Sequence, residues 1–282
     1  MGQLIDGKLI AQKIEAAVAQ QVAALKQKKI TPTLAVILVG EDKPSQTYVR
    51  KKGEAAERLG IKFILEKLPT ETTTAQLLKS LKKIQKTKNL SGLIVQLPLP
   101  KHIDTNTILN AINPAFDVDC LTDVNIGKMV MKTNLITPPT PGAVLAILDD
   151  LKVQLEGKNV TIIGTGALVG KPLAILLMNA GASVTTCNST TRDTKAKCLS
   201  ADIIVTGVGK KDILRGDMIG PGAIVIDTGV CFENGKMYGD VNVPEALDKA
   251  AWVTPTPGGV GPLTVAKLLW NTVVCAQKAR KA

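Results

Sequence analysis

The sequence predicts an α/β fold in two domains, each built on a mainly parallel β-sheet with helices on its faces. Short runs of apolar, β-branched residues alternate with longer segments of helical periodicity, which is typical of parallel strands buried on both faces. A proline-rich segment at residues 137–141, T-P-P-T-P, interrupts this alternation as a rigid break and marks a domain boundary. The chain has 282 residues, which is long enough for two such domains.

The part of the chain before residue 137 carries the first sheet. Three strands that alternate with helices favour a parallel sheet of their own. Polar residues at the carboxyl ends of such strands face the crevice where α/β proteins bind ligands, and Gln96 is the amide in the third apolar run. The expected strands are residues 34–39, 61–67 and 92–97, and the expected helices are residues 10–28, 44–60, 74–86 and 103–112.

The second sheet begins with K-N-V-T-I-I-G-T-G-A-L-V-G-K-P at residues 158–172. A buried strand is expected at residues 160–163 and a helix at residues 172–179. Between them lie Gly164, Gly166 and Gly170. This order predicts a phosphate site, because glycine lets the backbone approach a pyrophosphate and a helix N-terminus offers free N–H groups. The glycine spacing is one residue longer than the usual fingerprint, so a tight turn that binds nothing is the alternative to a Rossmann dinucleotide site.

The next strand of this domain, expected at residues 183–187, indicates which dinucleotide is bound. An NAD-binding domain usually has a carboxylate here, where it holds the ribose hydroxyls. No acid follows this strand before Asp193. The turn contains Ser189, other residues with hydroxyl groups, and Arg192. Hydroxyls and an arginine suit a 2′-phosphate, so NADP is favoured, with NAD or an ordinary turn as the alternatives.

The remaining elements complete this second domain. Strands are expected at residues 203–206 and 223–227, each followed by a glycine-bearing turn, and helices at residues 142–151 and 265–277. Thr206 and Val230 lie at these two turns, and we expect both to contact the dinucleotide. Residues 254–264, T-P-T-P-G-G-V-G-P-L-T, form a long loop of the kind that often carries function.

Composition limits the other functions. The formal net charge of +11 favours anionic partners, but the lysines are scattered and aromatic residues amount to 2%. Without aromatic residues between the cations a nucleic-acid partner is not expected, and a small phosphorylated or polycarboxylate molecule fits the charge instead.

Cysteine and histidine usage argues against several kinds of site. The five cysteines are odd in number and include no C-x-x-C pair, so neither a disulfide framework nor a zinc site is expected. The single histidine, His102, excludes a Ser-His-Asp triad and a multi-histidine metal site within this chain. No metal is expected. Because the sequence shows neither a signal peptide nor an apolar run of membrane-spanning length, a cytoplasmic protein without a membrane partner is expected.

Six short segments occur together in one order: Y-V-R-K-K, G-L-I-V-Q-L-P-L-P, D-V-D, T-P-P-T-P, V-G-K-P and P-G-G-V-G-P-L-T. With these segments in register, the chain resembles the bifunctional methylenetetrahydrofolate dehydrogenase/cyclohydrolase family along nearly its whole length. The resemblance implies an oxidoreductase and hydrolase of folate one-carbon metabolism, which serves purine and amino-acid biosynthesis. Methylenetetrahydrofolate would be oxidised with NADP to methenyltetrahydrofolate, which is then hydrolysed to formyltetrahydrofolate.

The resemblance also implies an arrangement of domains. A folate domain at residues 1–137, joined by the C-terminal helix at 265–282, would precede a Rossmann domain at 138–264. Tetrahydrofolate would bind in a cleft between the domains, and the family usually forms a homodimer through the Rossmann domain.

Individual roles follow from the resemblance position by position. Lys52 falls on the catalytic lysine, Gln96 on the glutamine that hydrogen-bonds this lysine, and Tyr48 on a tyrosine that stacks on the folate. Asp119 falls on the carboxylate that grips the pterin. The loop that closes over folate includes Pro257, Gly258, Gly259 and Pro262. The cofactor residues would be Gly164, Thr165, Gly166, Gly170, Ser189, Arg192, Thr206 and Val230.

Residue chemistry alone leaves simpler interpretations open. Tyr48 and Lys52 also fit an ordinary i,i+4 surface pair, Gln96 a strand end, and Asp119 a loop acid. A lysine close to Arg50 and Lys51, and partly removed from water, should have a lowered pKa that suits proton transfer in the hydrolysis step.

Three other classes of protein compete with this assignment. A short-chain dehydrogenase also uses Y-x-x-x-K, but there the pair follows the glycine turn in the same domain, and here it lies far before that turn. A basic nucleic-acid-binding protein and a dinucleotide sensor without turnover are the other two.

The chain departs from the family pattern at several positions. Thr165 stands where the family commonly has a phosphate-binding arginine, Asn188 where it has a histidine, and Thr190 where it has a lysine. These changes bear on the preference for NADP rather than on dinucleotide binding. Cys120 replaces a usual glycine and Pro139 a usual cysteine, and both are expected to be tolerated.

Overall fold

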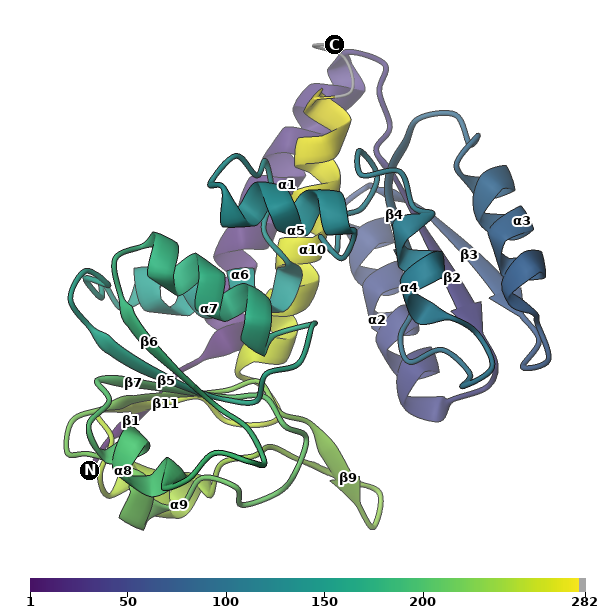
Figure 1. Cartoon of the computed structure of the whole chain (residues 1–282). Coiled ribbons are helices and arrows are strands. Elements are labelled where there is room, and N and C mark those ends of the chain that lie inside the picture. Colours follow the sequence, from purple (N-terminus) through teal and green to yellow (C-terminus); the bar gives the residue numbers. More distant parts are fainter. Residues whose placement is uncertain (279–282) are drawn as a thin grey trace. The chain divides into compact units, whose positions relative to one another are not determined.

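Two compact units make up the chain in the computed structural model, which describes residues 1–278 (Figure 1). One unit joins Met1–Gln12 to Thr140–Thr264, and the other joins Lys13–Pro139 to the chain from Val265 onward. Two long helices, α1 (Gly7–Gln27) and α10 (Val260–Lys278), pass from one unit to the other. The last four residues of the segment expected at 265–282 lie outside the described residues.

The unit of Lys13–Pro139 contains a three-stranded parallel sheet in the order β3-β2-β4 (Figure 1). Its strands are β2 (Thr33–Val39), β3 (Lys62–Leu68) and β4 (Leu90–Val95). Its helices, besides parts of α1 and α10, are α2 (Lys43–Arg58), α3 (Thr74–Ile84), α4 (Thr105–Asn110) and α5 (Asp123–Val130). The expected parallel sheet is therefore present.

The central strand β2 explains why this sequence folds as it does. All seven of its residues are buried, and alternate side chains enter two different hydrophobic clusters. One cluster holds Leu34, Val36 and Leu38 with residues of α1, α2 and α10, and the other holds Ala35, Ile37 and Val39 with residues of α3 and α4. A continuous apolar run is what a strand with helices on both faces requires.

The unit of Thr140–Thr264 contains a six-stranded parallel sheet in the order β1-β11-β8-β7-β5-β6. Consecutive strands β5 and β6 are neighbours, whereas β7 lies on the other side of β5. The order of the strands therefore reverses at β5, and such a switch point is where open α/β sheets bind ligands. The strands are β1 (Gln3–Leu4), β5 (Asn159–Ile163), β6 (Ser183–Cys187), β7 (Ile203–Thr206), β8 (Ile224–Asp227) and β11 (Trp252–Val253).

Helices and one hairpin surround this six-stranded sheet. The helices are α6 (Pro139–Asp150), α7 (Gly170–Asn179), α8 (Thr194–Leu199) and α9 (Val243–Leu247), with a 3₁₀ turn at Gly216–Met218. The antiparallel hairpin consists of β9 (Cys231–Glu233) and β10 (Lys236–Tyr238). No helix within residues 1–278 is both long and apolar enough to cross a lipid bilayer.

The expected start of the first domain at residue 1 is wrong. Residues 1–12 belong to the six-stranded unit, because β1 pairs with β11. The backbone N–H groups of Gln3 and Ile5 donate to the carbonyls of Ala251 and Val253, both at 2.8 Å. A strand of two residues has no periodicity of its own, so only its tertiary partner defines it.

Two prolines that were expected in irregular segments lie in the first turns of helices instead. Helix α6 begins at Pro139, inside the segment that was expected to be a rigid break. Helix α10 begins at Val260, so Pro262 lies in its first turn rather than in a loop. Proline is tolerated in a first turn because the N–H it lacks has no partner within the helix.

Candidate active site

Helix α2 presents Tyr48 and Lys52 one turn apart on the same face. The helix begins after Asp42, whose carboxylate accepts a hydrogen bond from the N–H of Ser45 at 2.9 Å. Gly53 lets the helix approach the sheet, because an added Cβ would lie 2.8 Å from the ring of Phe63. Capping and close packing therefore hold the helix that carries both residues.

Lys52 donates a hydrogen bond from Nζ to Oε1 of Gln96 at 3.0 Å, as the resemblance implied. Gln96 follows directly on β4, and its own N–H donates to the carbonyl of Ile37 at 2.9 Å. The side-chain Nε2 of Gln96 donates to the carbonyl of Leu97 at 2.7 Å. Since the amide nitrogen is held by a carbonyl, the amide oxygen must face Lys52. The hydrogen bond between Lys52 and Gln96 joins residues that are far apart in sequence.

Burial lowers the pKa of the Lys52 ammonium, and the nearby carboxylate of Asp119 partly offsets this effect. The expected lowering of the pKa is present, and of its two expected causes removal from water is the one that the structure bears out. Arg50 lies on the exposed side of α2, where it forms an ion pair with Glu54 at 2.6 Å. Removal from water, rather than repulsion by neighbouring cations, is what favours the neutral amine.

The three carboxylates of the segment that follows β4 have separate tasks. Burial raises the pKa of Asp119. The positive charge of Lys52 lowers this pKa, and the negative charge of Asp117 raises it further. Asp119 is thus the acid that lies beside the lysine. Asp117 is 1% exposed and accepts hydrogen bonds from the N–H and hydroxyl of Thr122 and from Asn125. Asp123 begins α5 and accepts a hydrogen bond from the side chain of Asn110 at 3.1 Å.

Helix α10 anchors the backbone directly before Asp119 and again at Thr137. Nδ2 of Asn271 donates to the carbonyls of Val118 and Thr137, at 2.9 and 2.7 Å. Sequence reasoning missed Asn271, since a lone amide in an apolar helix gives no signal. Cys120 has a φ of 56°, in the left-handed region, which explains why a glycine would suit this position. Its buried thiol has a raised pKa and donates to the carbonyl of Ile136 at 3.7 Å.

Tyr48 completes this group. Its side chain is half-buried, and burial raises the pKa of its phenol. A neutral, partly exposed ring next to Lys52 on the helix is available for stacking.

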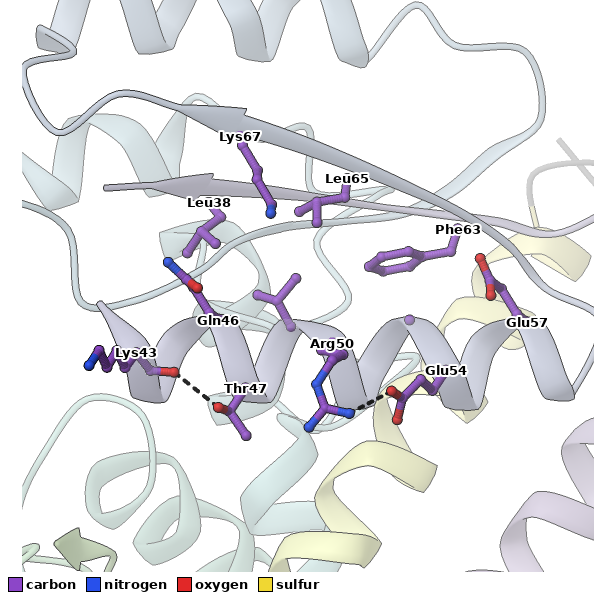
Figure 2. A pocket seen from close by; sticks show the side chains of 12 residues that line it. Leu38, Lys43, Gln46, Thr47, Arg50, Glu54, Glu57, Phe63, Leu65 and Lys67 are labelled. Carbon is purple, nitrogen blue, oxygen red and sulfur yellow. Dashed lines mark hydrogen bonds and ion pairs between the residues drawn. The ribbon is translucent and has the colours of Figure 1, made fainter. Parts of the chain in front are cut away.

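A groove of about 710 Å³ in the same unit lies away from this group of residues (Figure 2). Lys43, Gln46, Arg50 and Glu54 of α2 line it together with residues of β3 that include Phe63. Because helix residues are spaced by about 100°, Arg50 and Glu54 point roughly opposite to Lys52. The groove is therefore separate from the lysine site.

The glycine turn of the six-stranded unit has the shape of a phosphate cradle. A Cβ at Gly164, whose φ is 116°, would lie 2.5 Å from the carbonyl oxygen of Gly207, which follows β7. A Cβ at Gly170 would overlap the carbonyl oxygen of Gly164. Gly166, in contrast, faces open space, as expected for a backbone that a ligand approaches. No side chain caps the N-terminus of α7, but the N–H of Lys171 already donates to the carbonyl of Gly166 at 3.1 Å and Pro172 has no N–H, so the start of this helix offers an anion few N–H groups.

The turn after β6 holds the residues expected at the 2′-phosphate. Oδ1 of Asn188 accepts hydrogen bonds from the N–H and hydroxyl of Thr190, at 3.0 and 2.7 Å. The hydroxyl of Thr191 accepts a hydrogen bond from the N–H of Asn188 at 2.9 Å. Both threonines therefore serve the turn itself, whereas Ser189 and Arg192 are exposed. Thr165, in the glycine turn, supplies no positive charge.

Thr206 and Val230 differ in exposure. Thr206 is completely buried, and its hydroxyl donates to Oδ1 of Asp227 at 3.0 Å. Its side chain therefore does not reach the surface, and only the turn that it begins can touch a ligand. Val230 is 39% exposed at the turn after β8, and Gly209 approaches its carbonyl oxygen.

The loop expected to close over folate belongs to the six-stranded unit, unlike Lys52. Gly258 has a φ of 106°, and the N–H of Gly259 donates to the carbonyl of Pro255 at 2.8 Å. Pro257 precedes these glycines after a cis peptide bond.

Two family models match the chain in succession. The first, described as the catalytic domain of tetrahydrofolate dehydrogenase/cyclohydrolase, matches residues 5–119. The second, described as the NAD(P)-binding domain of the same enzyme, matches residues 120–280.

The chain belongs to the tetrahydrofolate dehydrogenase/cyclohydrolase family.

Relatives match along the full length. The Aliarcobacter butzleri protein named bifunctional protein FolD is 45% identical over 280 residues, covering 99% of this chain and 98% of the relative. The protein of the same name from Moorella thermoacetica is 43% identical over 277 residues, covering 98% and 99%.

Two solved structures share this fold. That of the bifunctional methylenetetrahydrofolate dehydrogenase/cyclohydrolase from Campylobacter jejuni has a TM-score of 0.96 and 39% identity, and covers 99% of this chain and 100% of the other. The Trypanosoma brucei enzyme, solved with NADP cofactor and inhibitor, has a TM-score of 0.96 and 36% identity, covering 100% and 99%.

These matches confirm the expected family and the two-domain α/β fold. They also confirm the two activities of the tetrahydrofolate dehydrogenase/cyclohydrolase family, which its name states. The catalytic-domain match contains Tyr48, Lys52, Gln96 and Asp119, and the NAD(P)-binding match contains the glycine turn.

Proposed function

We propose that this chain oxidises methylenetetrahydrofolate to methenyltetrahydrofolate with NADP and then hydrolyses the product to formyltetrahydrofolate. The observation that carries this proposal is the group of Lys52, Gln96 and Asp119. A partly buried amine of lowered pKa is held by an amide oxygen beside a carboxylate, within a chain of this family. The product serves one-carbon transfer in purine and amino-acid biosynthesis.

The oxidation step needs alignment more than acid–base catalysis. NADP, when bound, accepts the hydride from the methylene carbon. The folate nitrogens supply the electrons that replace the lost hydride, so no proton leaves. The contribution of the protein is to hold both reactants in a reactive geometry. Tyr48 would stack on the folate, and Asp119 would accept N–H groups of the pterin.

The hydrolysis step needs a proton carrier, and Lys52 has the properties of one. Water adds to the methenyl carbon, one O–H proton passes to the neutral amine, and one carbon–nitrogen bond breaks. The leaving nitrogen takes this proton back, the second proton of the water is released to solvent, and a neutral formyl group remains on the other nitrogen. Gln96 accepts one N–H of Lys52 and so orients the amine.

The test compares Lys52→Met with Lys51→Met, the neighbouring exposed lysine. Lys52→Met should lower cyclohydrolase turnover by roughly 100-fold or more, which is the size of a lost general acid–base group. The NADP dissociation constant should not change, because the glycine turn belongs to the other unit. Lys51→Met should leave both activities intact. Unchanged hydrolysis in Lys52→Met removes Lys52 from the mechanism.

NADP rather than NAD is the proposed cofactor. Ser189 and Arg192 are exposed in the turn after β6, and no acidic residue lies between the end of β6 and Asp193. The glycine cradle, with Gly166 facing open space, fits the pyrophosphate. Initial rates with each dinucleotide at matched concentrations test the preference, and an equal or higher kcat/KM with NAD would refute it.

A second copy of the chain is the proposed partner, through the six-stranded unit. Strand β6 is an edge of that sheet, and an edge carries unpaired backbone groups. Thr186 is exposed on this strand, and Thr186→Lys should weaken a dimer that uses the edge. Sedimentation of both proteins measures this, and a monomeric wild type removes the proposal.

We place the protein in a reducing cytoplasm, where the five cysteines stay free, as they are in the structure. Fractionation of cells tests the location directly.

The alternative of a nucleic-acid-binding protein has its own test. Retention on a DNA column that decreases as the salt concentration rises would favour that alternative.

A further inference from the structure

Two buried carboxylates of the six-stranded unit are not explained by the reaction as described. Asp227 is 2% exposed and ends β8, and Asp240 is 0% exposed and follows β10. Within residues 1–278 neither forms an ion pair with a lysine or arginine. A buried carboxylate is costly unless hydrogen bonds replace its water, so the donors around these two should show their purpose.

Asp227 joins four segments of the chain. Its Oδ1 accepts hydrogen bonds from the hydroxyl of Thr206 at 3.0 Å and from the N–H of Gly229 at 2.9 Å. Its Oδ2 accepts from the N–H of Val241 at 3.1 Å and from the hydroxyl of Thr256 at 3.5 Å. These donors lie at the end of β7, in the turn after β8, after β10, and in the loop before α10. One side chain thus ties together the segments at the carboxyl edge of the sheet.

Asp240 clamps the turn that follows β7. Its Oδ2 accepts a hydrogen bond from the N–H of Val208 at 2.6 Å, and its Oδ1 accepts from the N–H of Lys210 at 2.8 Å. The carboxyl group also packs on the turn after β8, because a Cβ added at Gly229 would overlap it. Asp240 therefore sets the positions of both turns relative to each other.

Both turns lie where a dinucleotide is expected. The turn after β7 touches the glycine turn at the switch point, since a Cβ at Gly164 would lie 2.5 Å from the carbonyl oxygen of Gly207. The side chains of Val208 and Val230 are 48% and 39% exposed on the two turns. Exposed apolar side chains at this edge offer van der Waals contacts to the face of a flat ring.

We propose that Asp227 and Asp240 are positioning residues for the dehydrogenase reaction, which hold the turns after β7 and β8 so that Val208 and Val230 contact the nicotinamide ring. The proposal rests on the function proposed above. The two aspartates act through backbone N–H groups and, for Asp227, through the hydroxyls of Thr206 and Thr256, and they touch neither substrate nor cofactor.

The donors around Asp240 explain why this residue is a carboxylate. All the groups that Asp240 binds are backbone N–H donors, and a carboxylate is an acceptor at both oxygens. An asparagine has the same shape, but its NH₂ would face an N–H group at one of the two positions. Asp240→Asn therefore disturbs one turn without changing the volume of the buried side chain.

The experiment compares Asp240→Asn with Asp217→Asn, an exposed aspartate of the same unit that pairs with Lys195. In Asp240→Asn, kcat/KM for NADP should fall roughly tenfold or more, because a hydrogen bond to a charged acceptor is lost. The KM for NADP should rise and the KM for methylenetetrahydrofolate should not. Cyclohydrolase activity, which needs no dinucleotide, should stay within about twofold of wild type. Asp217→Asn should change none of these values.

Each other outcome decides against the inference. Unchanged dehydrogenase kinetics in Asp240→Asn would overturn it, and a parallel loss of both activities would reduce the aspartates to a purely structural role. If Asp240→Asn does not fold, Thr206→Val removes one donor to Asp227 with little change in shape, and the same selective loss is expected. A wild-type protein that lacks dehydrogenase activity would instead refute the proposed function itself.

Discussion

The bond between Lys52 and Gln96 allows the proposed role of the lysine to be tested through its protonation. Gln96→Leu removes the amide oxygen that accepts from Nζ at 3.0 Å, and leucine has a similar volume. The bond orients the neutral amine, and a hydrogen bond between neutral groups contributes about 0.5–1.5 kcal/mol, so cyclohydrolase kcat/KM should fall roughly 2- to 13-fold.

The pH profile separates two substitutions that both lower the rate. The amide oxygen favours the ammonium form of Lys52, so its removal should lower the pKa of the lysine further. If the neutral amine is the active form, the rising limb of the cyclohydrolase profile should move to lower pH in Gln96→Leu. In Gln96→Glu a carboxylate faces the ammonium and stabilises it more strongly, so the limb should move to higher pH.

Stopped-flow absorbance of methenyltetrahydrofolate over a range of pH measures both limbs. Glu54→Gln is the control, since Glu54 pairs with Arg50 on the exposed side of the same helix. If the rising limb shifts in the same direction in both Gln96 variants, or does not shift in either of them, the assignment of Lys52 as the proton carrier is refuted.

Three further predictions concern folate, cofactor and the glycine turn. Asp119→Ala should weaken folate binding by about 1.5–3 kcal/mol, whereas Asp123→Ala should not, and calorimetric titration that finds equal dissociation constants would remove Asp119 from the site. Arg192→Ala should raise the KM for NADP and leave that for NAD unchanged, and equal changes in steady-state assays would mean that Arg192 does not bind the 2′-phosphate. Gly170→Ala should lower stability by about 1–3 kcal/mol in urea unfolding, because its Cβ overlaps a carbonyl. Gly166→Ala should keep stability and weaken NADP binding, and a reversed pattern would contradict the cradle.

Much of the fold could be predicted because the central strands β2, β4, β5 and β7 are almost completely buried. Strand β2 shows this best, since all seven of its residues are buried and its apolar run therefore appears directly in the sequence. The glycine turn could be found for a similar reason, because positions such as Gly170 have no room for a Cβ. The resemblance to a family then placed Lys52 with Gln96, a pair that local periodicity cannot connect.

Short elements and individual carboxylates could not be predicted in the same way. Strands β1 and β11 have two residues each, and only their pairing in the sheet defines them. Asp117 and Asp119 look equivalent in D-V-D, yet one is surrounded by hydrogen-bond donors and the other lies beside Lys52.

The sequence by itself determined the longer strands and helices, the glycine turn and the family, because each of these is encoded in short segments of consecutive residues. Only the tertiary structure decided that burial, rather than nearby cations, lowers the pKa of Lys52. It alone brought the turns after β7 and β8 together around Asp227 and Asp240. The physical reason is that burial and hydrogen-bond partners depend on which distant segments meet, and no local pattern records that.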